Sequence, residues 1–141
     1  MKIFDLTSKV ALVTGSSQGI GYALAKGLAE AGAKIILNGR KLNKLEAAAR
    51  KLRKNYESIE ILPFDVADHA MVAKKINEHY ASGSKIDILV NNAGIQHRAP
   101  LEDFSSEKFE LLMKTNVSSI FNVGQAVARY MIKEGKGKII N

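Results

Sequence analysis

The first candidate binding site in the sequence is a glycine-rich segment from Thr14 to Gly21. The run reads Thr-Gly-Ser-Ser-Gln-Gly-Ile-Gly, follows a short apolar segment and opens into an amphipathic one. Glycines let the chain turn sharply and let a ligand approach the backbone, and the N–H groups that begin a helix attract phosphate. The glycine order, G-x-x-x-G-x-G, differs from the G-x-G-x-x-G of many dinucleotide sites, and a purely structural turn is the alternative. We expect a phosphate-binding turn formed by Gly15, Ser16, Ser17, Gln18, Gly19, Ile20 and Gly21.

A second candidate is the cationic end of the next apolar run, Asn38-Gly39-Arg40. Dinucleotide sites that accept NAD(H) usually carry a carboxylate about 20 residues after the glycines. Here Gly39 stands near that position and Arg40 follows it. A carboxylate repels a 2′-phosphate, whereas a guanidinium pairs with one. We therefore predict that Asn38 and Arg40 contact the coenzyme and that NADP(H) is favoured over NAD(H). The alternative is that Arg40 is a solvated loop charge, and Gln18 adds no second positive charge.

These residues must be positioned by alternating strands and helices. Short apolar, β-branched runs predict strands, and apolar residues at intervals of three and four predict helices. Strands are expected at residues 9–14, 34–38, 60–63, 86–90 and 138–140, and helices at 20–31, 42–52, 69–80 after an Asp68 cap, after Ser105 or Ser106, and at 117–133. Strands that read as continuous apolar runs form parallel sheets covered on both faces. The predicted fold is α/β, a doubly wound parallel sheet of strand order 3-2-1-4-5, with a crevice at the carboxyl ends of the first and fourth strands.

The helix patterns also predict which side chains face the sheet. For residues 20–31 the predicted stripe is Ile20, Ala23, Leu24 and Leu28, and for residues 117–133 it is Val117, Ile120, Phe121, Gly124, Val127, Ala128 and Met131. The longer helix has a second apolar flank at Val123, Ala126 and Tyr130. A helix that is apolar on two sides needs two covers. We expect the sheet to cover the stripe, and further chain or another subunit of a homo-oligomer to cover the flank.

Composition places the chain among single globular domains. It has 141 residues, of which 46% are hydrophobic and 25% charged, and a formal net charge of +7. The positive charges fall mostly at helical spacing, which favours solvated helix faces over attraction of an anionic ligand, and no basic patch of the nucleic-acid-binding type is present. No apolar run could span a membrane, there is no cysteine, and the histidines lack metal-ligand spacing. We expect no metal, no nucleic acid, no membrane span and a cytoplasmic location.

Four motifs together resemble the short-chain dehydrogenase/reductase family. They are residues 14–21, Asp65-Val66, Asn91-Asn92-Ala93-Gly94 and Asn116-Val117, and the resemblance extends over the whole chain. It implies a Rossmann fold and a nicotinamide coenzyme. It also implies that Asp65 and Val66 border the adenine, and that Asn91, Asn92, Ala93 and Gly94 line the coenzyme cleft and support the sheet. Asn116 matches the catalytic asparagine of the family, which holds a water molecule in a proton relay. Without the family, Asn116 would be interpreted as a helix cap.

A narrower resemblance concerns residues 94–100, Gly-Ile-Gln-His-Arg-Ala-Pro, together with Phe4-Asp5-Leu6. These segments resemble the bacterial gluconate 5-dehydrogenases within that family, which implies a sugar acid as the small-molecule substrate and NADP(H) as the coenzyme. Arg98 is a candidate for attracting the substrate carboxylate, with a plain loop charge as the alternative. The family also contains 3-oxoacyl-carrier-protein reductases and sugar or steroid dehydrogenases, so these activities stay open.

The family's remaining catalytic residues are a serine after the fifth strand and a Tyr-x-x-x-Lys on the following helix. Residues 1–141 stop at the fifth strand, so we expect them to be the NADP-binding portion without the catalytic part and to show no turnover alone. Tyr22 and Lys26 have the Tyr-x-x-x-Lys spacing but follow the glycine turn, and we interpret them as ordinary helix residues. A non-catalytic dinucleotide-binding module is the alternative. The open edge of the fifth strand, or the flank of residues 123–130, predicts self-association.

Overall fold

One parallel five-stranded sheet organises the chain. The computed structural model describes residues 4–141, and residues 1–3 lie outside the described part. The elements in chain order are β1 (Val10–Val13), α1 (Gly19–Glu30), β2 (Lys34–Gly39), α2 (Leu42–Leu52), β3 (Ile59–Pro63), α3 (His69–Ala81), β4 (Ile88–Val90), the 3₁₀ turn η2 (Leu101–Asp103), α4 (Ser106–Met113), the π-helical turn η3 (Lys114–Ser118), α5 (Ser119–Glu134) and β5 (Lys138–Ile140). The strand order is β3-β2-β1-β4-β5 with all neighbours parallel, which confirms the predicted fold.

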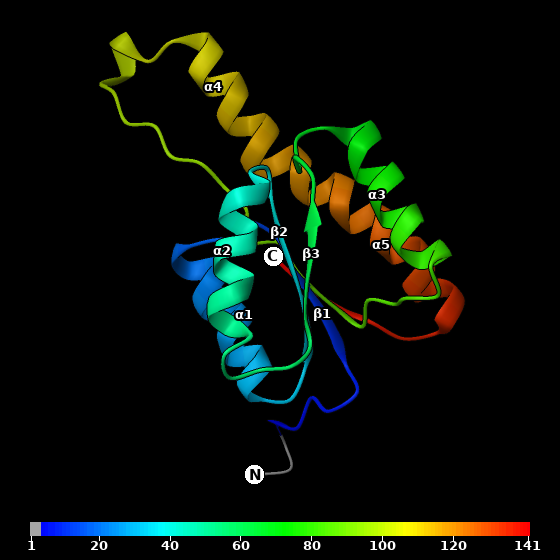
Figure 1. Ribbon diagram of the computed structural model, residues 1–141. Coiled ribbons are helices and arrows are strands. Elements are labelled where there is room, and N and C mark those ends of the chain that lie inside the picture. The colour runs from blue at the N-terminus through cyan, green and yellow to red at the C-terminus, as the bar shows by residue number, and fades with distance from the viewer. Residues whose placement is uncertain (1–3) are drawn as a thin grey trace.

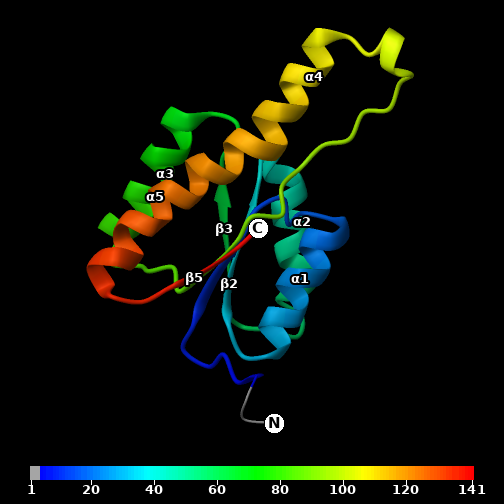
Figure 2. The same cartoon turned by 180° about the vertical axis from the view of Figure 1, so that it is seen from behind.

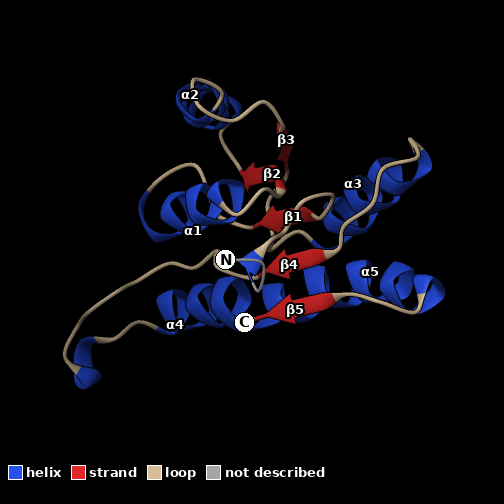
Figure 3. Ribbon diagram, turned by 90° about the horizontal axis from the view of Figure 1, so that it is seen from below, coloured by secondary structure: helices blue, strands red, loops and turns tan. Residues whose placement is uncertain are grey.

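Helices cover both faces of this sheet. α1 and α2 lie on one face and α3 and α5 on the other (Figures 1 and 2), and the view along the sheet shows the strands in a row (Figure 3). Because side chains alternate along a strand, Ala11 and Val13 of β1 join the core with α1 and α2, whereas Val10 and Leu12 join the core with α3 and α5. Every residue of β1 is buried, which is why this strand reads as a continuous apolar run.

α1 presents small residues to the sheet, and the stripe predicted for it is wrong except for Leu28. The buried residues of α1 are Gly21, Ala25 and Ala29. Leu28 is partly buried against the same core, but Ile20 is 76% exposed and Leu24 40% exposed. Small side chains let a helix approach its sheet closely, so the large apolar residues of α1 are left on its outer side.

The stripe predicted for α5 is confirmed in its second half and wrong in its first half. Val127 and Met131 of that stripe are buried, whereas Val117 and Phe121 are 53% and 63% exposed. Val123 of the predicted flank is buried as well. The second cover of the flank is α3 of the same chain. Tyr80 of α3 stacks on Tyr130 with ring centroids 3.8 Å apart, and both rings pack on the core that contains Val127.

Local signals set the ends of the helices. Asp68 caps α3 as predicted, because its carboxylate accepts a hydrogen bond from the Met71 N–H at 2.9 Å. Of the two candidate caps for α4, Ser105 is the one that accepts from the Lys108 N–H. Gly135 ends α5 with a left-handed φ of 69°. α4 projects away from the body of the molecule (Figure 1). No helix within residues 4–141 is long and apolar enough to cross a membrane.

Candidate functional site

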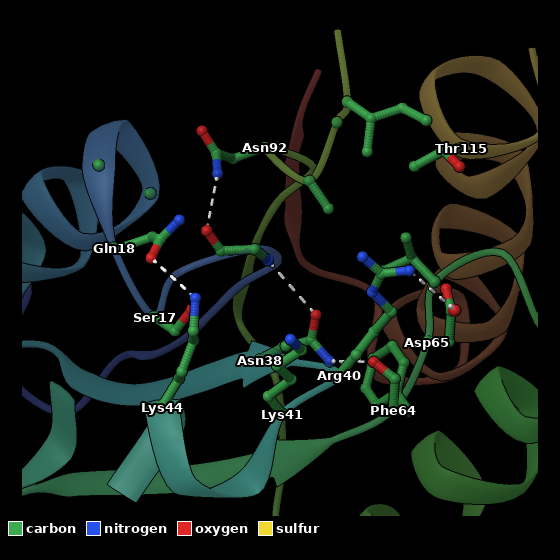
Figure 4. A pocket seen from close by; sticks show the side chains of 18 of the residues that line it. Ser17, Gln18, Asn38, Arg40, Lys41, Lys44, Phe64, Asp65, Asn92 and Thr115 are labelled. Atoms are coloured by element: carbon green, nitrogen blue, oxygen red, sulfur yellow. Dashed lines mark hydrogen bonds and ion pairs between the residues drawn. The ribbon is translucent and has the colours of Figure 1, made fainter. Parts of the chain in front are cut away.

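A cleft of about 490 Å³ opens at the carboxyl ends of β1 to β4 (Figure 4). The residues predicted from the sequence to contact a coenzyme or to line its cleft all line this cleft, except Ser16 and Asn91. The Asn91 Nδ2 instead donates to the Asn141 Oδ1 at 2.8 Å, next to β5. The structure adds lining residues that the sequence analysis did not assign: Gly39, Lys41, Lys44, Phe64, Ile95 and Thr115. A cleft of this volume is in the range that holds small-molecule ligands and cofactors.

The glycine turn has three glycines with three different roles. Gly15 has a left-handed φ of 63°, and a Cβ there would lie 2.8 Å from the Ala93 Cα. Gly19 has a φ of 61°, but its Cβ would meet nothing within 4 Å, so the backbone is open to a ligand on that side. A Cβ at Gly21 would clash with the Asn92 amide and the Gly15 carbonyl. Gly15 therefore lies where the chain turns, Gly19 leaves the backbone accessible, and Gly21 lets α1 begin close to the loop after β4.

Thr14 and Asn92 join the turn after β1 to the loop after β4. The Thr14 hydroxyl accepts hydrogen bonds from the N–H groups of Asn92 and Ala93, both at 3.0 Å. The Asn92 amide donates to the carbonyls of Thr14 at 3.0 Å and Gly15 at 3.3 Å. The sequence analysis gave Thr14 no role of its own. The only signal was a hydroxyl residue at the end of an apolar strand.

Asn38 and Ser16 hold the floor beneath the turn. Asn38 is fully buried, and its Nδ2 donates to the carbonyls of Leu62 at 3.0 Å and Phe64 at 3.2 Å. Its Oδ1 accepts from the Gly15 N–H at 3.4 Å. The Ser16 hydroxyl is also buried, donates to a β1 carbonyl at 2.7 Å and accepts from the Asn38 N–H at 3.0 Å. Because both side chains bond within the protein, they position the turn.

The N-terminus of α1 faces the cleft without a cap. Gln18 occupies the cap position, makes no side-chain capping hydrogen bond, and no acidic residue lies in the first turn. α3 and α4, by contrast, are capped by side chains. The N–H groups of Gly19, Ile20 and Gly21 therefore begin α1 at the cleft with no capping side chain, where they favour an anion.

Charged side chains gather where β2 ends. Arg40, Lys41, Lys44 and Asp65 all line the cleft. The Arg40 Nη1 lies 3.8 Å from the Asp65 Oδ2, and the Lys44 Nζ donates to the Gln18 Oε1 at 3.5 Å (Figure 4). Three cations beside one carboxylate leave an excess of positive charge, which attracts phosphate. Lys41 and Lys44 are both exposed, as expected if the positive charges lie on solvated helix faces, and they line the cleft as well.

Asn116 lies in the π-helical turn and bonds to the loop that follows β4. Its Oδ1 accepts from the Ile95 N–H and its Nδ2 donates to the Ile95 carbonyl, both at 2.8 Å. The side chain thus fixes residues 94 and 95 beside the cleft, and a Cβ on Gly94 would lie 3.3 Å from the Asn116 Oδ1. Asn116 does not line the cleft, whereas its neighbour Thr115 does.

The structure separates two other candidates from the cleft. Tyr22 packs partly buried against the core and Lys26 pairs with Glu30 at 3.3 Å, so this Tyr-x-x-x-Lys pair is ordinary helix structure, as predicted. Arg98 is exposed and is not a lining residue. It lies in the segment that runs outward from the end of β4 toward α4 (Figure 2).

A doubly wound parallel sheet, a glycine turn that leads into an uncapped helix, and cations at the end of the second strand define a dinucleotide-binding protein of the Rossmann type. Residues 9–141 match the sequence profile of the short chain dehydrogenases. The chain belongs to this family, whose members are oxidoreductases.

Several individual members of the family are similar to nearly the whole of this chain. The chain is 48% identical to a gluconate 5-dehydrogenase of Gluconobacter oxydans over 99% of its own length and 54% of the relative's. It is 37% identical to a 5-keto-D-gluconate 5-reductase of Escherichia coli over 99% of its length and 55% of the relative's. A crystal structure of a gluconate 5-dehydrogenase from Burkholderia cenocepacia, in complex with NADP and tartrate, superposes with a TM-score of 0.93 at 51% identity, over 98% of this chain and 54% of that one.

Reductases with other names also match. A 3-oxoacyl-[acyl-carrier-protein] reductase of Chlamydia trachomatis is 39% identical over 96% of this chain and 55% of its own. The chain spans about half the length of the curated relatives it matches.

Proposed function

We propose that the protein is an NADP(H)-dependent short-chain oxidoreductase that interconverts a hydroxyl and a carbonyl group of a sugar acid, of the gluconate 5-dehydrogenase type. The observation that carries the proposal is the group of three cationic side chains at the end of β2, Arg40, Lys41 and Lys44. Gly39 lies near the position where NAD(H)-binding sites usually have a carboxylate, and Arg40 is next to it. The similarity to gluconate 5-dehydrogenases, one of them in complex with NADP, supports the same coenzyme and substrate class.

In this proposal each part of the cleft binds a different part of the coenzyme. The N–H groups at the start of α1 bind the pyrophosphate, and Gly19 leaves the backbone open to it. Arg40 pairs with the 2′-phosphate through charge-assisted hydrogen bonds. Asp65 and Val66 border the adenine, and Asn92, Ala93 and Gly94 line the remaining wall. The bound coenzyme supplies the hydride acceptor or donor.

Asn116 acts in this scheme as a positioning residue. Its side-chain amide is occupied by both polar groups of the Ile95 backbone. The role that the family resemblance implies for Asn116, holding a water molecule in a proton relay, stays a proposal beside this positioning contact.

Coenzyme binding tests the proposal directly. Isothermal titration calorimetry should give a lower Kd for NADP⁺ than for NAD⁺. Arg40→Ala should weaken NADP⁺ binding by about 10- to 100-fold and leave NAD⁺ binding nearly unchanged, because only the 2′-phosphate loses a charged partner. Arg50→Ala on the exposed side of α2 is the control for a lost cation. Equal affinities for the two coenzymes, or equal losses in Arg40→Ala, would contradict the NADP assignment.

Substrate class and turnover need separate assays. Gluconate with NADP⁺ is compared with a 3-oxoacyl thioester with NADPH, because the matched reductases include both types. Faster reduction of the thioester would favour the second activity. We propose that residues 1–141 alone bind coenzyme without turnover, since the expected serine and Tyr-x-x-x-Lys would follow the fifth strand. NADP-dependent gluconate oxidation by that polypeptide would refute this, and a gene that stops at codon 141 would favour a non-catalytic binding module.

A further inference from the structure

The ion pair between Arg40 and Asp65 lies inside the proposed coenzyme cleft. Both residues line the cleft, and the Arg40 Nη1 lies 3.8 Å from the Asp65 Oδ2 (Figure 4). Arg40 follows β2 and Asp65 follows β3, so the pair joins the ends of two neighbouring strands. A guanidinium that already faces a carboxylate is not free to face a phosphate at the same atom.

The two partners differ in how firmly they are held. The other oxygen of Asp65, Oδ1, accepts a hydrogen bond from the Ala67 N–H at 2.9 Å, which fixes the carboxylate in a local turn. Asp65 is 40% exposed, whereas Arg40 is 66% exposed. An exposed ion pair of this kind contributes little to stability, so Arg40 can leave it at small cost. The carboxylate stays behind when Arg40 moves.

We propose that Asp65 sets the coenzyme preference by holding Arg40 in the free protein and competing with the 2′-phosphate for it. This inference rests on the proposed role of Arg40. Binding of NADP(H) exchanges a carboxylate partner for a phosphate partner and leaves the negative charge of Asp65 near the 2′-phosphate. Binding of NAD(H) requires no exchange. Asp65 therefore lowers the advantage of NADP(H) over NAD(H), independently of any contact that it makes with the adenine.

The isosteric variant Asp65→Asn separates the competition for Arg40 from a contact of Asp65 with the adenine. Its side-chain oxygen can still accept from the Ala67 N–H, but the charge that holds Arg40 is gone. We expect the ratio of the NAD⁺ Kd to the NADP⁺ Kd to rise by about three- to tenfold, the range expected for an exposed pair plus the removed repulsion. A lost adenine contact changes both affinities by one factor and cancels in the ratio. Glu46→Gln, an exposed change of the same charge on α2, should leave the ratio unchanged.

A double-mutant cycle tests whether the effect passes through Arg40. In an Arg40→Ala background, Asp65→Asn should raise the ratio by a clearly smaller factor, because only the direct repulsion of the 2′-phosphate is then removed. Adenosine 2′,5′-bisphosphate and AMP should show the same pattern as the two coenzymes, because they differ in the 2′-phosphate and lack the nicotinamide. Raising the ionic strength should shrink the effect, since salt screens exposed charges.

The results of these binding measurements distinguish a failure of the proposed function from a failure of this inference. If Arg40→Ala leaves the coenzyme preference intact, both the proposed role of Arg40 and this inference fail. If Arg40→Ala abolishes the preference but Asp65→Asn leaves or lowers the ratio, the proposed function stands and this inference is overturned. An equal rise in the ratio with and without Arg40 would mean direct repulsion of the phosphate by Asp65, which also overturns the competition. Circular dichroism confirms that each variant is folded.

Discussion

Gly21 leaves no room for a side chain between α1 and the loop after β4. A Cβ there would clash with the Asn92 amide and the Gly15 carbonyl, which are already hydrogen-bonded to each other. We expect Gly21→Ala to lower the free energy of unfolding by about 1–3 kcal/mol, as overpacking does. It should also weaken the binding of both coenzymes, because the displaced turn carries the phosphate-binding N–H groups. Urea unfolding and calorimetry measure the two effects.

Gly27 is the matched control on the same helix. A Cβ at Gly27 would meet nothing within 4 Å. Alanine restricts the unfolded chain more than glycine does, so Gly27→Ala should raise the free energy of unfolding by about 0.5–1 kcal/mol and leave coenzyme binding unchanged. A Gly21→Ala protein as stable as the parent would show that α1 and the β4 loop do not pack as closely as described.

At the scale of the elements, Asp87 ties β4 to β1 at the end of the sheet opposite the cleft. Its side chain is 6% exposed, its Oδ2 accepts from the Val10 N–H at 2.9 Å, and Lys85 lies 3.2 Å away. Burial acts to raise the pKa of Asp87, but the Val10 and Lys85 contacts outweigh it, and the pKa is lowered from 3.8. The sequence analysis placed this residue in a strand and gave it no role.

Removal of the Asp87 carboxylate should destabilise the fold without affecting the cleft. Asp87→Ala leaves the Val10 N–H without its partner, and we expect the free energy of unfolding to fall by about 1–3 kcal/mol. Because the folded pKa is lowered, the charge of Asp87 contributes stability above pH 3.8, and this is lost as the pH falls through the folded pKa. The free energy of unfolding of Asp87→Asn, measured with urea between pH 2 and 5, should therefore depend less on pH than that of the parent protein. This interval extends about one unit or more on either side of the usual carboxyl pKa. A changed coenzyme Kd would contradict a purely structural role.

The packing of α3 on α5 is a second case in which an element contact sets the chemistry of a residue. Burial raises the pKa of Tyr80 to about 12, so its hydroxyl stays neutral and donates to the Ile86 carbonyl at 3.3 Å. Its ring stacks on Tyr130, whose hydroxyl donates to Asn77 at 2.8 Å. These contacts explain why the flank that was predicted to need further chain or another subunit is covered by α3.

For the whole molecule, self-association stays a prediction. The predicted β5 edge is exposed, the predicted flank is covered by α3, and the structure adds a further apolar surface. Exposed apolar side chains follow each other at intervals of four along α4, η3 and α5: Phe109, Met113, Val117 and Phe121. We expect sedimentation velocity to show concentration-dependent association, and Val117→Ser with Phe121→Ser to reduce it, because the apolar area available for burial falls. Leu24→Ser on α1 is the control. A parent protein that sediments as a monomer at high concentration would contradict the prediction.

Local sequence patterns were enough to predict the alternation of strands and helices, the strand order and the glycine turn. Apolar runs, helical spacing and turn residues are local signals, and each is readable within a few neighbours in the chain. Asn92 was predicted only from the family resemblance, whereas Gly15 was predicted from such a local signal, the glycine turn. For the same reason the limits of the strands and long helices differ from the predicted ones by at most two residues.

The packed structure was needed to show which faces of α1 and α5 are buried, that Ser16 and Asn38 lie beneath the turn, and that Lys44 lines the cleft. The sequence of a helix that is apolar on several sides does not show which side is buried. For α5 the buried side depends on its packing against α3. Lys44 contacts Gln18, and Asp65 contacts Arg40, and in both pairs the two residues are distant in the sequence. Their meeting depends on how the crossovers bring the strand ends together, which local patterns do not contain.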